Sequence, residues 1–554
     1  MADSLFGAVS AAVEKTVERT AVSARAVVEL VRSGVIRPIR PDRILGMGVG
    51  GLRYGLTLTA GYAAGAARHP DRTAIVDDAG WVSYAELGRR TDRLARSLAG
   101  LGVGAGDRVG VLCRNHRGAV EAQVAVAKLG ADVVLLNTGL PAAQLATVAE
   151  EQKMRLVVAD ADFGDKLDAL PDDATIVIGW HDGPVGHPTL DELIARNGPG
   201  TLPLRPAEGR TIVLTSGTTG PPKGARRPKP SGLTPVAAVL SAIPLKAGEP
   251  VFIAAPLLHT WGNAGLLLAV LHGSPVVLTR RFDAEAALEL VERERCDAVI
   301  AVPVMLQRWL DLPEDVLAAA WQEHRPRIVA VSGSALAAPL ATAFMDRFGD
   351  ILYNLYGSTE VSWVSIAGPA DLRAAPGTTG RAPVGTRLVI LDEHDQPVPP
   401  GVEGRVFVGN DMPFEGYTRE GADVERHGDL LGTGDVGRLD DEGRLHLTGR
   451  ADDMIVSGGE NVHPGPVEEL LEERPEVREV AVVGVDDEKF GQALAAFVVV
   501  SDGADVSADD VRGWVRSELT RFSVPRDVHF LDELPRNATG KIAKKELPVS
   551  ASDT

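Results

Sequence analysis

The chain is poor in cysteine, in positive charge and in long apolar runs. Only Cys113 and Cys296 occur in 554 residues, which excludes a disulfide framework or a cysteine-built zinc site and is typical of a reducing cytoplasm. Lys and Arg number 57 against 76 Asp and Glu, so the formal net charge of −19 argues against nucleic acid as a partner. The longest apolar stretches, such as residues 264–271, fall far short of the ~20 residues of a membrane-spanning helix.

The length sets the scale of organisation. A chain of 554 residues exceeds the ~250–300 at which one core stops growing, so two or more domains are expected. Residues 1–50 form a separate helical extension, in which an apolar stripe predicts an amphipathic helix rather than a secretory signal. Its members are Leu5, Phe6, Val9, Val13 and Val17. Docking on the protein's own surface is the favoured interpretation; a weak membrane-surface contact and a contact within a homodimer stay open.

Short apolar runs alternate with amphipathic segments from about residue 71 to residue 357. Amphipathic segments such as 118–128 and 284–294 separate several of the runs, which predicts mostly parallel sheets covered by helices, an α/β fold. Ligands in such sheets bind at the carboxyl ends of the strands. The runs are 108–112, 132–136, 156–159, 175–178, 251–254, 275–278, 298–302 and 327–331.

The pattern changes twice towards the C-terminus. Residues 380–449 contain short strands, such as 386–391 and 405–408, between Pro, Gly and Asp turns, which predicts a small antiparallel β unit. A mixed α+β tail of about 100 residues follows Arg450. We therefore predict a large domain over residues 51–451 and a small mobile domain over 452–554, with a hinge at Asp452.

A loop rich in glycine and hydroxyl groups follows the apolar run at residues 211–213. Residues 214–224 read Leu-Thr-Ser-Gly-Thr-Thr-Gly-Pro-Pro-Lys-Gly. Glycines let backbone N–H groups approach a polyanion and Lys223 adds a positive charge, so the loop suits phosphate. A turn stiffened by two prolines explains this stretch equally well by itself. The Walker loop is excluded because Gly224, not a hydroxyl residue, follows Lys223.

Two polar stretches follow apolar runs of the large domain. His259 lies in Ala-Pro-Leu-Leu-His-Thr-Trp-Gly, directly after the run 251–254, although a histidine between apolar residues is more often a satisfied core group. Residues 354–360 combine Tyr356, a glycine, two hydroxyls and Glu360. An aromatic ring can stack on a base, and a carboxylate is the hard oxygen ligand that Mg²⁺ prefers. A capped helix start gives the same pattern.

Three further stretches lie nearer the C-terminus. Asp435 ends Gly-Thr-Gly-Asp, where its carboxylate could accept both hydroxyls of a ribose, or simply close a turn. Residues 449–464, from Gly449 to Pro464, span the expected hinge. Lys541 stands on a glycine turn within residues 535–542 and, taken alone, is an ordinary surface lysine.

Together these six stretches resemble, in order and spacing, the adenylate-forming superfamily of acyl- and aryl-CoA synthetases, luciferases and peptide-synthetase adenylation domains. The resemblance covers residues 60–545, and Ser-Gly-Gly-Glu-Asn-Val-His-Pro over 457–464 is similar to the CoA-ligase form. The whole chain looks most like bacterial medium- and long-chain fatty-acyl-CoA synthetases, including Cys-Arg-Asn-His at 113–116. It departs from the pattern at residues 225–227 and at Gly432, where a bulky residue is commoner.

The resemblance implies an enzyme that uses ATP, Mg²⁺ and CoA to convert a fatty acid into acyl-AMP and then acyl-CoA. The β- and γ-phosphates would be held by Thr215, Ser216, Gly217, Thr218, Thr219, Gly220 and Lys223. Adenine would lie between the Gly333, Ser334 and Ala335 turn and Tyr356, with Gly357 beside it, and Asp435 and Arg450 would hold the ribose. The catalytic set would be Thr359 at the α-phosphate, Glu360 on Mg²⁺, Lys541 bridging carboxylate and α-phosphate, and His259.

The resemblance also implies a second step. Rotation about Asp452 would withdraw Lys541 and bring Ser457, Gly458 and Gly459 to the pantetheine channel. The acyl tunnel would be bordered by His259, Trp261 and Gly262. Small residues after Trp261, namely Gly262, Ala264 and Gly265, favour an alkyl chain, or are close-packing positions of a buried helix. Two alternatives stay open: a ligase that loads a carrier protein or another acceptor, and a non-catalytic acyl- or nucleotide-binding paralogue.

Overall fold

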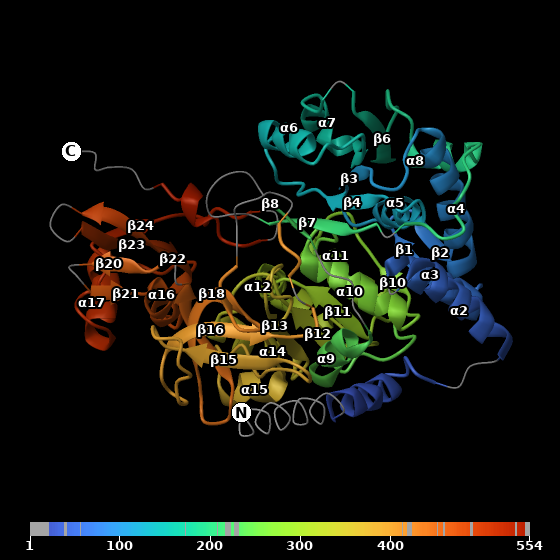
Figure 1. Ribbon diagram of the computed structural model, residues 1–554. Coiled ribbons are helices and arrows are strands. Elements are labelled where there is room, and N and C mark those ends of the chain that lie inside the picture. The colour runs from blue at the N-terminus through green and yellow to red at the C-terminus, as the bar shows by residue number, and fades with distance from the viewer. Residues whose placement is uncertain are drawn as a thin grey trace, which may run out of the picture.

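The computed structural model describes most of the chain in detail (Figure 1). The described residues are 21–37, 41–55, 57–171, 173–207, 209–215, 223–226, 232–412, 414–417, 424–450, 453–457, 460–487, 491–537 and 540–548. The predicted stripe from Leu5 to Val17 and the predicted hinge residue Asp452 lie outside them. Four sheets organise the described residues.

A six-stranded sheet forms the first layer of the large domain. Its strands are parallel except for β8, which pairs antiparallel with β7. Buried Val, Ile and Leu residues fill these strands because helices cover both faces of a parallel sheet. In sheet order the strands are β6 (Thr175–Trp180), β5 (Leu156–Asp160), β3 (Arg108–Leu112), β4 (Asp132–Leu135), β7 (Thr211–Thr215) and β8 (Lys223–Arg226).

An eight-stranded sheet forms the second layer. Its inner strands are parallel, and the edge strands β14 and β2 pair antiparallel with their neighbours. In sheet order the strands are β14 (Ser365–Ala367), β13 (Leu352–Tyr356), β12 (Ile328–Val331), β11 (Ala298–Ala301), β9 (Val251–Ile253), β10 (Val276–Val277), β1 (Thr73–Asp77) and β2 (Gly80–Ser83). All eight predicted runs therefore contain strands, with ends that differ by one or two residues.

Helices cover both sheets, and one of them is buried on nearly all sides. Helix α5 (Arg117–Lys128) contacts strands of both sheets, which explains why its sequence is apolar or small almost all round. The other helices of this domain are α4 (Tyr84–Gly100), α6 (Ala142–Glu151), α7 (Gly164–Leu167), α8 (Leu190–Arg196), α9 (Thr234–Ala242), α10 (Thr260–Leu271), α11 (Ala284–Arg293), α12 (Pro303–Leu310), α13 (Glu314–Ala319), α14 (Ala338–Phe348) and α15 (Pro369–Ala374).

Two smaller sheets follow, as the sequence predicts. The antiparallel unit contains β15 (Arg387–Leu391), β16 (Gly404–Gly409), β18 (Leu430–Leu439), β17 (Arg426–His427) and β19 (Leu445–Arg450). The C-terminal sheet contains β21 (Glu460–Val462), β20 (Ile455–Ser457), β23 (Gly491–Val500), β22 (Val477–Asp487) and β24 (Asp527–Phe530), with α16 (Pro464–Glu472) and α17 (Ala508–Glu518) beside it. Figure 1 shows this orange and red part at one side of the molecule.

The described part of the N-terminal extension packs against the large domain. Residues 21–32 are helical, and Ala26 and Leu30 are buried in the same core as strands β9 to β13. The Ala247 N–H donates to the Ser33 carbonyl at 2.7 Å. Helices α2 (Pro41–Tyr54) and α3 (Leu58–Arg68) follow. Among the described residues, no helix has the length and apolarity needed to cross a membrane.

Candidate active site

A cavity of about 1890 Å³ lies between the large domain and the C-terminal residues. Its walls follow the ends of strands β9, β12 and β13 and continue to β18, β19 and the turn before the C-terminus. The predicted site residues that line it are His259, Trp261, Gly262, Gly333, Ser334, Ala335, Tyr356, Gly357, Thr359, Glu360, Asp435, Arg450 and Lys541. Segments that are up to about 280 positions apart in the sequence therefore share one cavity.

The loop after β9 is held by a residue of the other sheet. Asn115, which is buried at the start of α5, donates to the Ala255 carbonyl at 2.9 Å and accepts from the Leu257 N–H at 2.8 Å. These bonds fix the backbone that leads to His259. The Nε2 atom of His259 is buried without a hydrogen-bond partner among the described residues, and burial lowers the pKa of this imidazole to about 4. His259 is therefore neutral at physiological pH.

Helix α10 begins next to the loop that ends β13. The Thr260 and Thr359 hydroxyls are 3.1 Å apart, so the two predicted stretches are in direct contact. Trp261 donates from its indole nitrogen to the Ala301 carbonyl at 3.0 Å, which fixes the ring beside β11. A Cβ on Gly262 would lie 2.3 Å from the Pro256 carbonyl oxygen, so close packing requires glycine there. Of the two interpretations of the small residues, close packing holds for Gly262.

The stretch after β13 is a strand end followed by a tight turn, and the alternative of a capped helix start is wrong. Tyr356 is the last strand residue, and a Cβ on Gly357 would lie 2.1 Å from the Ser362 carbonyl oxygen. The Ser358 hydroxyl donates to Glu360 Oε2 at 2.8 Å, and the Tyr417 hydroxyl donates to Oε1 at 2.9 Å. Both oxygens of the carboxylate are thus held at the cavity wall.

Asp435 and Arg450 face each other across two paired strands. They are register partners in β18 and β19, and Arg450 Nη1 lies 3.5 Å from Asp435 Oδ1. The Tyr356 hydroxyl donates to the other carboxylate oxygen. Burial, and then the Asp435 charge, raises the pKa of Tyr356 well above its usual value, so the phenol keeps its proton and remains a donor. Aromatic ring and carboxylate form one rigid unit.

The turn that carries Lys541 reaches the large domain. A Cβ on Gly540 would lie 2.4 Å from a methyl carbon of Val304, so only glycine permits this approach. The backbone N–H of Lys541 donates to Asn537 Oδ1 at 3.1 Å, and Arg536 donates to the Gly540 carbonyl at 2.7 Å. The structure therefore holds the C-terminal domain in the orientation that brings Lys541 to the cavity.

The other predicted site residues are described only in part or not at all. Thr215 pairs with Lys223 at the end of the β7–β8 hairpin, so the loop joins two antiparallel strands as well as following a buried one. Residues 216–220 lie outside the described ranges, as do Gly458 and Gly459. Ser457 ends β20 and pairs with Glu460.

The sequence reasoning missed the cavity residues Thr260 and Tyr417, and the supporting role of Asn115 behind the cavity wall. Thr260 stands directly beside His259 and could have been found from its hydroxyl in that stretch. Tyr417 offered no signal, because an isolated tyrosine among turns of an antiparallel unit predicts nothing about Glu360. Burial, and then the Glu360 charge, raises the Tyr417 pKa. Asn115 was noticed only as part of the resemblance, without its role as the support of the β9 loop.

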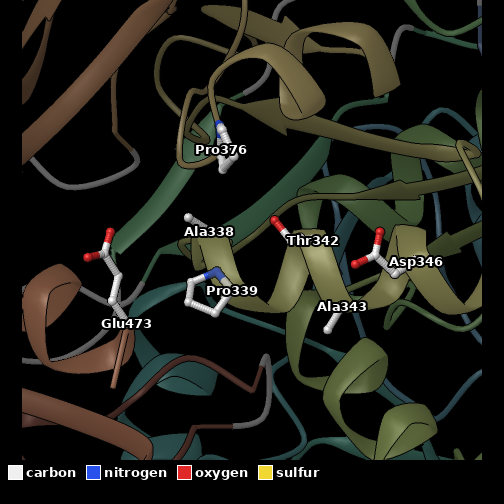
Figure 2. A pocket seen from close by; sticks show the side chains of 7 residues that line it. All are labelled: Ala338, Pro339, Thr342, Ala343, Asp346, Pro376 and Glu473. Atoms are coloured by element: carbon white, nitrogen blue, oxygen red, sulfur yellow. The ribbon is translucent and has the colours of Figure 1, made fainter. Parts of the chain in front are cut away.

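Acidic residues of α16 line the cavity opposite the large domain. Glu468 pairs with Lys544 at 2.8 Å, and burial raises the pKa of Glu472 to about 8, with Glu468 and Glu469 adding to the shift. A smaller hollow at the same seam, of about 430 Å³, separates Glu473 from Ala338 and Pro339 of α14 (Figure 2). Asp346 of α14 lines the same hollow, so carboxylates lie on both sides of the seam.

The raised pKa of Glu472 predicts how stability changes with pH. The folded protein holds a proton on Glu472 that the unfolded chain releases above its ordinary pKa of 4.5, so this contribution is lost as pH rises through about 8. The melting temperature of Glu472→Gln relative to the parent should therefore be higher at pH 9 than at pH 6. Glu473→Gln, next along the chain and exposed, is the matched control and should show no such trend. Equal differences at both pH values would contradict the assignment.

A second polar cluster lies away from the cavity and has the geometry of a structural support. Cys113, His116 and Asp160 are all buried, with possible metal-ligand atoms within 4.8 Å of one another. His116 Nδ1 accepts from the Gly118 N–H at 3.1 Å, and Nε2 lies 2.7 Å from Asp160 Oδ1. Both ring nitrogens are thus engaged, and burial raises the pKa of the Cys113 thiol, so it stays protonated. The cluster caps α5 and joins it to β5.

Two protein-family models match this chain. Residues 62–418 match the model of the AMP-binding enzyme family, and residues 466–541 match the AMP-binding enzyme C-terminal domain. The chain belongs to the AMP-binding enzymes. It is 32% identical over 489 residues to a feruloyl-CoA synthase of Amycolatopsis sp, which covers 86% of this chain and 96% of that protein.

Two solved structures show the same fold. The amide bond synthetase McbA from Marinactinospora thermotolerans superposes with a TM-score of 0.77 at 28% identity, covering 90% of this chain and 98% of that one. The o-succinylbenzoate CoA synthetase MenE from Bacillus subtilis, in complex with the acyl-adenylate OSB-AMP, gives 0.75 at 27% identity, covering 89% and 98%. The α/β architecture of this AMP-binding enzyme is therefore that of adenylate-forming enzymes, as predicted.

This AMP-binding enzyme is an AMP-forming acid–thiol ligase that uses ATP, Mg²⁺ and CoA. The residues present fit these groups. Glu360 offers a carboxylate at the cavity wall, and Tyr356 presents an aromatic ring beside the Asp435 carboxylate. Mg²⁺ supplies charge neutralisation when phosphate oxygens and a carboxylate must come together.

Proposed function

We propose that the enzyme activates a carboxylic acid with a medium or long alkyl chain to acyl-AMP, releases pyrophosphate, and transfers the acyl group to CoA. The observation that carries this proposal is the single cavity that unites Tyr356, Thr359, Glu360, Asp435 and Lys541. In our proposal Thr359 contacts the nucleotide, and Thr260 belongs to the stretch that borders the acid. Their hydroxyls are 3.1 Å apart, so the two binding sites are adjacent.

The first half-reaction needs two anions to meet, so positioning and charge neutralisation dominate its barrier. In our proposal Tyr356 and the 333–335 turn hold adenine, while Asp435 and Arg450 hold the ribose. Thr359 contacts the α-phosphate and Glu360 holds Mg²⁺. Lys541 places its ammonium between the acid carboxylate and the α-phosphate, where a carboxylate oxygen attacks phosphorus and pyrophosphate leaves. The phosphate-loop residues from Thr215 to Lys223 complete the set.

The second half-reaction needs a thiol to reach the acyl carbon. Gly540 packs closely on Val304, so the turn that carries Lys541 lies against the large domain. In our proposal this turn blocks the path by which the thiol would enter the cavity. We infer that the domain rotates about Asp452 after adenylation, withdraws this turn, and brings the strand end at Ser457 with Gly458 and Gly459 to the thiol channel. The CoA thiolate then attacks the acyl carbon and AMP leaves.

The acyl group would lie along α10. Residues 260–264, 267 and 268 of this helix line the cavity, over a distance of about 12 Å at ~1.5 Å per residue. Val236 and Val239 of α9 line the cavity as well. The aliphatic side chains on this part of the cavity wall suit an alkyl chain, because apolar area removed from water drives its binding.

Two observations favour other candidates. The feruloyl-CoA synthase and the succinylbenzoate enzyme act on aromatic acids by their names, so an aryl acid is the second candidate substrate. The similar fold of an amide bond synthetase favours a nitrogen nucleophile as an acceptor in addition to CoA or a carrier protein. An acyl- or nucleotide-binding protein without catalysis is disfavoured by the presence of Glu360, Asp435, Arg450 and Lys541.

A substrate panel tests the proposal directly. Pyrophosphate exchange is measured with straight-chain acids from acetate to palmitate and with benzoate-, ferulate- and indoleacetate-like acids, and product release is measured with CoA, with a carrier protein and with simple amines. We expect the largest kcat/KM with a medium or long alkyl acid, and product release only with CoA. A sharp maximum at an aryl acid would overturn the alkyl assignment, and absence of exchange with every acid would overturn the function.

A further inference from the structure

The junction of α2 and α3, just after the N-terminal extension, contributes to the wall of the cavity. Thr57 and Leu58 line it together with Leu267 of α10 and Val239 of α9. Both residues precede position 62, where the match to the family model begins. A segment that would count as an accessory by its position therefore reaches the same cavity as Thr359 and Lys541.

The packing of α3 on α10 shows where Leu58 lies. A Cβ on Gly61 would lie 2.6 Å from a methyl carbon of Val270. Four residues later, a Cβ on Gly65 would lie 2.3 Å from the Tyr84 ring, whose hydroxyl donates to the Ser274 carbonyl at 3.1 Å. The two helices therefore approach each other closely at Gly61 and Val270. Leu58 is one turn before Gly61 and Leu267 is one turn before Val270, and both line the cavity.

Leu58 begins α3, directly after the corner between α2 and α3, which side-chain hydrogen bonds hold in place. The Thr57 hydroxyl donates to the Tyr54 carbonyl at 2.9 Å and accepts from the Ala60 N–H at 3.3 Å, so it joins the end of α2 to the start of α3. Arg53 donates to the Pro203 carbonyl at 2.8 Å and anchors the same corner to the large domain. A side chain held this way cannot easily retreat from a ligand.

We propose that Leu58 and Leu267 form the far wall of the acyl site and set the longest alkyl chain that the enzyme accepts. The proposal rests on the alkyl-acid function above. In that function the carboxyl end of the acid lies at Thr260 and Thr359, and the cavity continues along α10 to Leu267, with Leu58 in its wall. The terminal methyl group of the acid would contact these two leucines, so their volume determines the chain length at which steric conflict begins.

The test compares chain-length profiles of variants at this wall. Leu58→Ala should raise kcat/KM about tenfold for an acid two methylenes longer than the parent's optimum, relative to the optimum itself, because each buried methylene contributes several-fold. Leu58→Phe should lower it by a similar factor for the longest acid that the parent accepts. Leu52→Ala is the matched control, since Leu52 lies in α2 a few residues before the same junction but is 82% exposed. Its profile should equal the parent's.

The outcomes separate this inference from the proposed function. A parent enzyme without exchange on any alkyl acid overturns the proposed function before any variant is made. An active parent whose profile is unchanged in both Leu58 variants overturns only the inference. A uniform change in KM for all chain lengths also overturns it, because that result assigns Leu58 to the entrance. If Leu58→Ala fails to fold, as judged by its melting temperature, Leu267→Val carries the same prediction with a smaller shift.

Discussion

Replacing Lys541 by alanine should lower the rate of pyrophosphate exchange by about 10²–10⁴-fold while thioester formation from supplied acyl-AMP and CoA stays within a few-fold of the parent. The proposed role of the ammonium is confined to the crowded anionic transition state of adenylation. Gly540 holds this turn against Val304, so the lysine reaches the cavity only when the C-terminal domain is in the orientation described here. The two half-reactions should therefore respond differently.

Lys545→Ala is the matched control for this experiment. Lys545 lines the same cavity four positions further along the chain, so removing it changes the local charge equally. Exchange should fall by no more than a few-fold in this variant. If Lys541→Ala lost both half-reactions to the same degree with the fold intact, or if Lys545→Ala lost exchange as severely, the specific role of Lys541 would be wrong.

Replacing Asp160 by alanine should lower the free energy of unfolding by about 2–6 kcal/mol, because it leaves two hydrogen-bond donors without a partner at about 1–3 kcal/mol each. Asp160 Oδ1 lies 2.7 Å from His116 Nε2, and Oδ2 accepts from the Arg114 N–H at 2.9 Å. Both donors would be left without a partner in a site where Asp160 and His116 are 0% exposed. Denaturant titration of the large domain measures the loss.

Asp162→Ala provides the comparison. Asp162 lies two residues further along and forms ion pairs with Arg280 and Arg281 nearer the surface, so its loss should cost about 0–1 kcal/mol. Pyrophosphate exchange of folded Asp160→Ala at low temperature should remain measurable, since the residue does not line the cavity. Equal destabilisation by the two variants would show that the His116 cluster is no more important than a surface pair.

The layers of the large domain could be predicted because their strands are short, buried and rich in branched residues. Residues 108–112 and 156–159 became β3 and β5 almost to the residue, since a strand covered on both faces has little choice of composition. Strand β13, which ends at Tyr356, is not among the eight predicted runs. Its pairing with β14, from a later part of the chain, continues the strand through Tyr356, and local pattern cannot show such a partner.

The residues of the candidate site likewise fall into those that a local sequence pattern indicates and those that only tertiary contacts place. Tyr356, Glu360 and Asp435 were found because each lies in a short polar stretch with its own local chemistry. The position of Leu58 at the cavity could not be predicted, because nothing in the local sequence distinguishes an aliphatic residue that lines a cavity from one that packs in the core. Tyr417 likewise acquires its contact with Glu360 through the tertiary fold, at 2.9 Å. The roles of the site residues remain proposals that the variants above test.

The Asn115 side chain has a consequence for how this protein can move. Its amide belongs to a loop of the six-stranded sheet, yet it accepts from Leu257 and donates to Ala255 on a loop of the eight-stranded sheet. Sliding one sheet over the other would break these bonds in a dry interior, where replacement by water is not available. These bonds therefore oppose movement between the two layers, so the domain rotation proposed above would displace the large domain as one body.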